Sequence, residues 1–348
     1  MKRLVTILQK AASQLLLFAV LAGAMASCDS VLDHKEGDCT VKYQVRFKYD
    51  YNMKFANAFA NEVKTVTLYA FDKNGQLIYQ KIEEGDMLKK EDYSMQVDIE
   101  PGEYHLIAWA GLNDESFAVP LLSPGSSDID ELTVKTNRIT QTRANGEGEN
   151  LVNKKLAPLW HGESVRAFTR SGNGKDNVIT IDLVKNTNIL RIVLTQLGQE
   201  NIDIDKFDFA IYDDNGWMNY DNTLLKDELL TYKPYSTNTG TTTRATADGG
   251  NTPIALATAE LSVARLIADK NPILRITNKE TNEVVIQVSL IEYIRLLKMS
   301  QYSTMSDQEY LDREDEYTMT FILDKDMTWL KTQIIINGWI IRLNDSDL

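Results

Sequence analysis

The sequence predicts an all-β protein in which two β-sandwich domains follow one another. Apolar residues alternate with polar ones over many short segments, which is the pattern of strands with one buried face. Turn-forming pairs such as Asn74-Gly75 and Pro101-Gly102 separate these segments at short intervals. The chain of 348 residues is also longer than one sandwich of about 100 residues requires, so two domains are expected.

The first sandwich is expected at residues 39–168. Its opening strand is clear, because apolar and polar residues alternate strictly from Val41 to Tyr49. Asn74-Gly75 predicts a hairpin, since both residues tolerate positive φ. The other expected elements are a helical turn at 55–60, strands near 63–71, 76–82, 95–99, 104–110 and 132–135, a surface loop at 142–150 and a closing strand at 156–166.

The second sandwich is expected at residues 178–348, after a polar linker at 169–177. Residues 213–216 predict a hairpin turn, and the Thr-rich stretch 235–251 is expected to be an exposed loop. Residues 290–299 have near-helical apolar spacing. The expected strands are 178–185, 189–197, 207–212, 255–266, 272–278, 284–290, 317–323 and 332–343.

The first 27 residues have the three parts of a secretory signal peptide. Lys2, Arg3 and Lys10 form a positive head, an uncharged apolar run follows at 15–22, and small residues occupy 23–27. The apolar run is shorter than the roughly 20 residues that a membrane-spanning helix needs. This leader is therefore expected to be removed on export.

Cys28 directly follows Met25-Ala26-Ser27 and resembles the lipobox cysteine of bacterial lipoproteins. In that class the thiol is acylated and becomes the new N-terminus, and two or more acyl chains hold a protein stably on a membrane. The alternative is an ordinary signal peptide with a cysteine nearby by chance. Cys28 is the expected lipid-attachment site, and the acidic residues 28–38 are expected to form a flexible tether.

Charge and cysteine content narrow the class of protein further. The formal net charge is −13, and the leader carries three of the positive residues and no negative one, which leaves about −16 for the rest. A nucleic-acid partner would need a basic face, so none is expected. Cys39 is the second of the two cysteines. If Cys28 is acylated, no intrachain disulfide can form.

The sequence contains no constellation that predicts an enzyme. Its three histidines are His34, His105 and His161, and none belongs to a zinc-binding pair. Nucleophile elbows, phosphate-binding loops and dinucleotide fingerprints are all missing. His161 is expected to be a structural histidine. We therefore expect no catalytic residue and no cofactor.

Two acidic clusters contain the carboxylates that a calcium site needs. Residues 213–216 lack the alternating ligand spacing of an EF-hand loop and its distal Glu. The cluster at 312–316 is interrupted by Arg313 and is expected to be a solvated helix end or loop. No metal site is predicted at either place.

Five blocks of the chain resemble the Bacteroidales fimbrial anchor family of FimB-type minor subunits. They lie at 39–55, 66–75, 101–109, 305–317 and 334–339. The resemblance implies two tandem transthyretin-like β-sandwich domains on a lipidated N-terminus. It further implies a surface-exposed lipoprotein of the outer membrane that anchors and terminates a fimbrium, or pilus, by strand exchange with stalk subunits.

Two questions stay open at this point. Five residues follow Leu343, so either the chain has no separate donor strand or residues 332–343 are themselves the donor. The alternative function is a surface-exposed adhesive tip or a glycan-binding lipoprotein, because tip and anchor can share the two-sandwich plan. An extracellular enzyme is disfavoured by the missing acid–base groups.

Overall fold

The computed structural model describes residues 43–142, 146, 148–169, 177–199, 201–245, 249–336 and 339–342. The predicted signal peptide, the lipid-attachment site Cys28, the tether and His34 lie outside the described residues. The described residues from Tyr43 onward belong to one compact unit. Within the described ranges, no helix is both long and apolar enough to cross a membrane.

The described residues form many short strands and few helices. In the N-terminal half, residues 43–185, the strands are β1 (Tyr43–Lys48), β2 (Thr65–Phe71), β3 (Leu77–Glu84), β4 (Met95–Val97), β5 (Gly102–Ala110), β6 (Phe117–Ala118), β7 (Val134–Thr136), β8 (Ile139–Thr142), β9 (Gly148–Val152), β10 (Trp160–Phe168), β11 (Val178–Asp182) and β12 (Val184–Lys185). Its helical elements are α2 (Phe59–Glu62), η1 (Gly85–Lys89) and η2 (Ile129–Glu131).

The C-terminal half, residues 187–342, is built in the same way. Its strands are β13 (Thr187–Leu197), β14 (Phe207–Asp213), β15 (Trp217–Met218), β16 (Leu230–Tyr232), β17 (Ser236–Ala245), β18 (Asn251–Ala264), β19 (Ile273–Asn278), β20 (Val284–Ser289), β21 (Glu316–Leu323), β22 (Trp329–Ile336) and β23 (Trp339–Arg342). Its helical elements are η3 (Ile204–Lys206), α3 (Leu290–Gln301) and α4 (Asp307–Arg313).

Two facing sheets make up most of the N-terminal half. Their strand orders are β11-β1-β4 and β12-β10-β5-β2-β3. Rings from β1 meet rings from β10 across the gap. The ring centroids are 4.6 Å apart for Tyr43 and Phe168, and 5.8 Å apart for Tyr49, just beyond β1, and Trp160. Alternate side chains of β1 therefore fill the space between the sheets.

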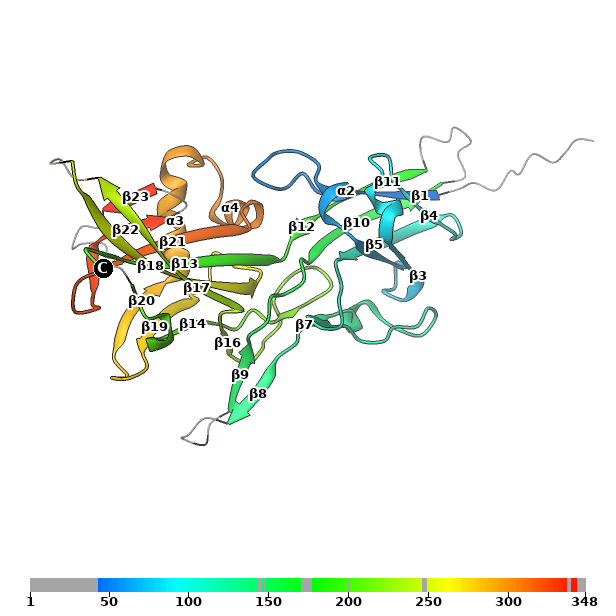
Figure 1. The fold of residues 1–348 in the computed structure, drawn as a ribbon. Helices are drawn as coiled ribbons and strands as arrows, with labels where there is room; N and C mark the ends of the chain where they lie inside the picture. The colour runs from blue at the N-terminus through cyan, green and yellow to red at the C-terminus, as the bar shows by residue number, and fades with distance from the viewer. Residues whose placement is uncertain are drawn as a thin grey trace, which may run out of the picture. The chain divides into compact units, whose positions relative to one another are not determined.

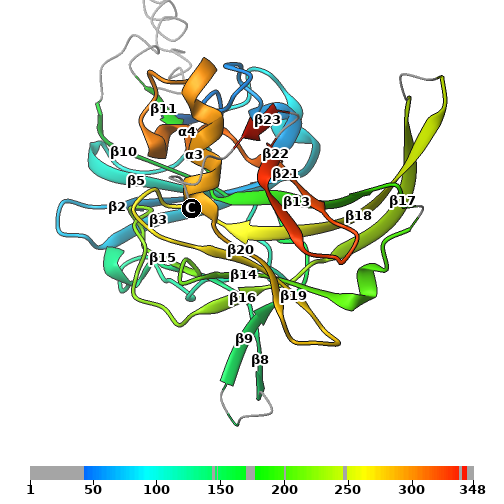
Figure 2. The same ribbon diagram turned by 90° about the vertical axis from the view of Figure 1, so that its left-hand side faces the viewer.

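The C-terminal half contains two six-stranded sheets. Their orders are β17-β18-β13-β21-β22-β23 and β20-β19-β14-β16-β9-β8, and a small sheet β15-β7-β6 adjoins them. Figures 1 and 2 show α3 and α4 on one side of the β13–β21 sheet and the β14–β19 sheet on its other side. One cluster of buried apolar residues runs from Tyr69 and Trp109 to Ile211 and Phe321, so the two halves share a core.

Strand pairing crosses the expected boundary between the two sandwiches. β9 pairs in parallel with β16, which places residues 148–152 in a sheet of the C-terminal half. Conversely, β11 follows the predicted linker and pairs in parallel with β1. The division into domains 39–168 and 178–348 stays a prediction, and the shared strands and core tie its two parts together.

The structure confirms the mostly β-strand composition and several local predictions. β2 and β3 form the expected hairpin, and Gly75 takes φ +84°, as a turn of this kind requires. The helical spacing at 290–299 corresponds to α3. The charged stretch after it forms α4, whose N-cap Ser306 accepts a hydrogen bond from the Glu309 N–H at 3.0 Å.

Several local predictions were wrong. The single strand expected at 332–343 falls in β22 and β23, which pair with each other. Residues 213–216 do not close a hairpin, because β14 pairs with β16 and β19 while β15 pairs with β7. The Thr-rich stretch is exposed as expected, but it forms β17, paired along its length with β18. The surface loop at 142–150 includes the end of β8 and the start of β9, which pair with each other. Thr and other β-branched residues favour extended backbone even where neither face is buried.

Candidate functional site

β1 is the first described strand after the predicted tether, so it is where the body of the protein begins. Its apolar side chains Tyr43, Val45 and Phe47 are at most 2% exposed. The ladder with β11 is extended at both ends, because the Gln44 N–H donates to the Asn177 carbonyl at 2.8 Å and the Leu183 N–H donates to the Lys48 carbonyl at 2.7 Å. Together these contacts hold β1 firmly between its two neighbours.

An aromatic cluster packs against the buried face of β1. The Phe47 ring stacks on Phe59 of α2 at 5.7 Å between centroids, and Tyr93 lies 5.8 Å from Phe59 and 6.3 Å from Phe47. The Tyr93 hydroxyl donates to Glu83 Oε2 at 2.5 Å. These rings connect β1 to α2, to β3 and to the segment that precedes β4.

A charged junction connects the two halves beside a cavity of about 310 Å³. Lys185 pairs with Glu62 at 3.4 Å and also with Asp315, so it joins both halves. The Arg313 guanidinium lies 4.0 Å from the centroid of the Tyr51 ring. Glu62, Lys185 and Asp315, which line the cavity, are thus already paired with one another, which is the arrangement of a structural joint.

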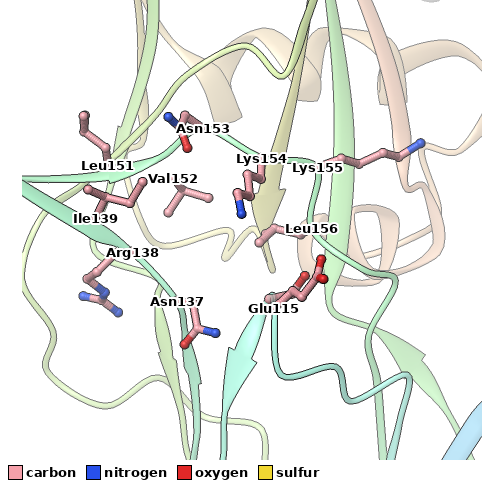
Figure 3. Close-up of a pocket in the computed structure, with 11 residues that line it drawn as sticks. Glu115, Asn137, Arg138, Ile139, Leu151, Val152, Asn153, Lys154, Lys155 and Leu156 are labelled. Atoms are coloured by element: carbon pink, nitrogen blue, oxygen red, sulfur yellow. The ribbon is translucent and has the colours of Figure 1, made fainter.

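A second, smaller cavity of about 120 Å³ lies between the chain at 137–139 and β9 (Figure 3). Arg138 lines it, but both terminal nitrogens of Arg138 donate to the Asp227 carboxylate, at 2.9 and 2.7 Å. Ligand pockets for small molecules usually measure about 300–1,000 Å³. This cavity is smaller and its guanidinium is engaged, so it offers no substrate site.

The two described histidines make fixed hydrogen bonds. His161 is buried, and because a carbonyl can only accept, its Nε2–H donates to the Tyr220 carbonyl at 2.7 Å. Burial lowers the pKa of His161 to about 4, against the opposing effect of that hydrogen bond. His105 Nε2 lies 2.7 Å from Glu163 Oε2. Both imidazoles are therefore engaged in hydrogen bonds to other residues of the chain.

The acidic clusters are structural as well. Asp312 is buried and paired with Arg265, so the expectation of a solvated helix end at 312–316 was wrong for this residue. Asp213 is buried too, and burial raises its pKa to about 7. Among the described residues, no group of three or more His, Cys, Asp or Glu side chains could hold a metal ion.

The outer strands of the sheets are the candidate sites for a protein partner. An edge strand presents unpaired backbone N–H and C=O groups that can take up another strand. The outer strands of the larger sheets are β3, β12, β17, β23, β20 and β8. Sequence patterns predicted strands but not which ones would be outermost, and β17 was missed altogether.

Comparisons with known proteins point to one family. The profile of the family described as "Mfa2: Fimbrillin-A associated anchor proteins Mfa1 and Mfa2" matches residues 35–345. The minor fimbrium anchoring subunit Mfa2 of Porphyromonas gingivalis is 23% identical over 333 residues, which cover 94% of each chain. The solved structure of the fimbrial anchor protein Mfa2 from that organism has the same fold, with a TM-score of 0.60 at 19% identity over 87% of this chain and 99% of the other.

Two solved structures from Bacteroides thetaiotaomicron are more similar. A candidate adhesin is 35% identical with a TM-score of 0.74, over 87% of this chain and 97% of the other. A candidate polysaccharide-binding protein is 33% identical with a TM-score of 0.72, over 88% of this chain and 99% of the other. The similarity therefore extends over almost the whole of each relative.

Proposed function

Because the chain belongs to the family of fimbrillin-A associated anchor proteins, we propose that it anchors and terminates a fimbrium at the bacterial outer membrane. Membership of this family makes it a structural protein and not an enzyme. The observation that carries the proposal is the extent of the family match, which begins at residue 35, just behind the lipobox-like cysteine.

The anchor itself is Cys28. In this proposal residues 1–27 are removed, Cys28 is acylated, and residues 28–38 tether the body to the outer leaflet on the cell surface. Two or more acyl chains would give stable attachment without a transmembrane helix. The buried position of β1 supports this arrangement, since a pull on the tether would load a strand that is bonded on both sides.

The body holds its fimbrial neighbour through strand addition. We propose that it consists of two transthyretin-like sandwiches and that a stalk subunit pairs with one sheet edge, where main-chain groups give affinity and side-chain pockets give specificity. In this proposal the partner strand does not displace β1, which is paired on both sides. Replacing β1 would loosen the strand that connects the lipid to the body.

The pairing of the last described strands bears on whether the chain has a separate C-terminal donor strand. β22 pairs with β21, and β23 pairs with β22, within the chain's own six-stranded sheet. This pairing favours the view that residues 332–343 are in-domain strands. An anchor at the end of a fimbrium needs to accept one partner only.

The alternative is an adhesive tip or a glycan-binding lipoprotein. The description of one relative as a candidate polysaccharide-binding protein is the observation that favours it. Glycan platforms usually expose several aromatic rings, whereas Phe55 is the exposed aromatic among the side chains described here. Immunogold labelling at the free end of the fimbria, rather than at the cell, would favour the tip.

The anchoring proposal is tested by replacing each of the two cysteines. Cys28→Ala in the native strain should abolish labelling with a palmitate analogue and release whole fimbriae into the medium. Cys39→Ala is the matched control and should leave both labelling and retention unchanged. Fimbriae that stay bound to Cys28→Ala cells would refute the proposal.

A further inference from the structure

β1 and β11 form a parallel ladder that connects the start of the body to the C-terminal half. β1 is the first described strand after the predicted tether, and β11 continues through Leu183 and β12 into β13. Figure 1 shows β11, β12 and β13 following one another from the N-terminal half into the C-terminal half. There β13 is paired on both sides, with β18 and with β21. A pull on the tether and a pull from the C-terminal half therefore meet at the β1–β11 ladder.

The register of this ladder decides the direction in which it is pulled. Gln44 lies opposite Val178, and Lys48 lies opposite Asp182. A pull on the tether acts at the Gln44 end of β1, whereas a pull from the C-terminal half acts at the Asp182 end of β11. These two ends are about 13 Å apart along the strands and about 4.8 Å apart across them. The opposing forces therefore act nearly parallel to the strands.

The hydrogen bonds of the ladder lie across this direction. The Gln44 N–H donates to the Asn177 carbonyl at 2.8 Å, and the Leu183 N–H donates to the Lys48 carbonyl at 2.7 Å. Alternate residues of a strand bond to the same neighbour, so Arg46 faces β11 as well. A force along the strands stretches all of these bonds together. A force across the strands would break them one after another, starting from one end.

The buried side chains of β1 also oppose sliding. Tyr43, Val45 and Phe47 are buried on one face of the strand. Because successive side chains point to opposite faces, a slip of one residue along β11 would turn all three away from the core. The Phe47 ring would then lose its contacts with the rings of Phe59 and Tyr93.

We propose that β1 and β11 form a mechanical clamp that carries tension between the lipid-attached tether and the C-terminal half by resisting shear. The inference rests on the proposed function, because tension arises only in a chain that is held at the membrane and by a fimbrial partner. The clamp makes the attachment of the tether strongest along the direction in which an anchored fimbrium pulls.

Single-molecule force measurements with two pulling directions test the clamp. The soluble chain starts at Cys28, carries Cys39→Ala and is held at Cys28 and at one added cysteine. Leu197→Cys, at the exposed end of β13, pulls the ladder from its opposite ends. Thr169→Cys pulls across the start of β1, because the Thr169 carbonyl lies 3.4 Å from the Tyr43 hydroxyl. At the same loading rate, β1 should separate at a force at least about twofold higher with Leu197→Cys than with Thr169→Cys.

Two destabilised variants locate the resistance. Phe47→Ala removes a ring under β1, and Asp312→Ala breaks an ion pair in the C-terminal half. With Leu197→Cys as the second attachment point, Phe47→Ala should lower the force at which β1 separates. Asp312→Ala should leave that force unchanged, because α4 lies outside the stretched part of the chain.

Equal forces in the two pulling directions would overturn the inference. An equal loss of force in Phe47→Ala and Asp312→Ala would overturn it too, because the resistance would then belong to the fold as a whole. Both measurements use the unlipidated chain without a fimbrial partner. Their outcome is therefore separate from the release of fimbriae that tests the anchoring proposal.

Discussion

Arg265 and Asp312 form a two-pronged ion pair, with 2.8 Å from Nε to Oδ1 and 2.8 Å from Nη2 to Oδ2. Gln308 donates to the same Oδ1 at 2.9 Å, and Arg265 Nη1 donates to the Asn222 carbonyl at 3.0 Å. The cluster connects α4, the end of β18 and the loop before β16. Asp312 is only 7% exposed, so the pair lies largely out of water.

Asp312→Ala should lower the free energy of unfolding by about 3–5 kcal/mol, because it leaves the Arg265 guanidinium poorly exposed and without its carboxylate. Urea unfolding measures this loss. Glu283→Ala removes an exposed carboxylate and should change the free energy of unfolding by less than about 0.5 kcal/mol. Equal effects of the two substitutions would show that the pair contributes little.

Phe47→Ala should lower the free energy of unfolding by about 3–5 kcal/mol, because it removes the ring that packs beside both Phe59 and Tyr93 and leaves a cavity under β1. Hydrogen exchange should show β1 opening first. Arg46→Ala changes the exposed neighbour on the same strand and serves as the control. An unaltered unfolding midpoint in Phe47→Ala would mean that the aromatic cluster does not hold β1.

Asp213 should make the protein less stable as the pH rises from about 4 to about 7. Burial raises its pKa from 3.8 to about 7, so the folded state keeps a proton that the unfolded chain has released. Its Oδ2 has no hydrogen-bond partner among the described residues, which adds to the penalty for charging it.

Asp213→Asn imitates the protonated carboxyl and should therefore be more stable than the unaltered chain at pH 8 but not at pH 4. Each pKa unit corresponds to about 1.4 kcal/mol. Unfolding curves at the two pH values give the difference, with the exposed Asp326→Asn as control. A gain of the same size at both pH values would contradict the assignment.

His161 should have the opposite pH dependence. Burial lowers its pKa from 6.5 to about 4. Between these two pH values the imidazole is therefore protonated in the unfolded chain and neutral in the folded state. Stability is then lost as the pH falls from about 6.5 towards 4. His161→Gln should flatten this part of the profile, which thermal unfolding at pH 4.5 and 7 measures. A profile that keeps its full slope in His161→Gln would assign the acid sensitivity to other groups.

The sequence by itself determined the strand-rich class, the hairpin at Asn74-Gly75, the helical spacing at 290–299 and the family. These features are local, because each depends on residues that are neighbours in the chain. They are the alternation of apolar and polar residues, a turn dipeptide and blocks of residues that resemble the family. Cys28, the candidate lipid site, was likewise available only from the sequence, since it lies outside the described residues.

Only the tertiary structure decided which strands pair. β1 finds its parallel partner β11 more than 130 positions along the chain, β9 joins the sheet of the other half, and Asp213 and Asp312 are buried by segments distant in sequence. An alternating pattern states that one face of a strand is apolar, but it does not state which backbone will bond to either edge. That choice depends on how all the strands share one core.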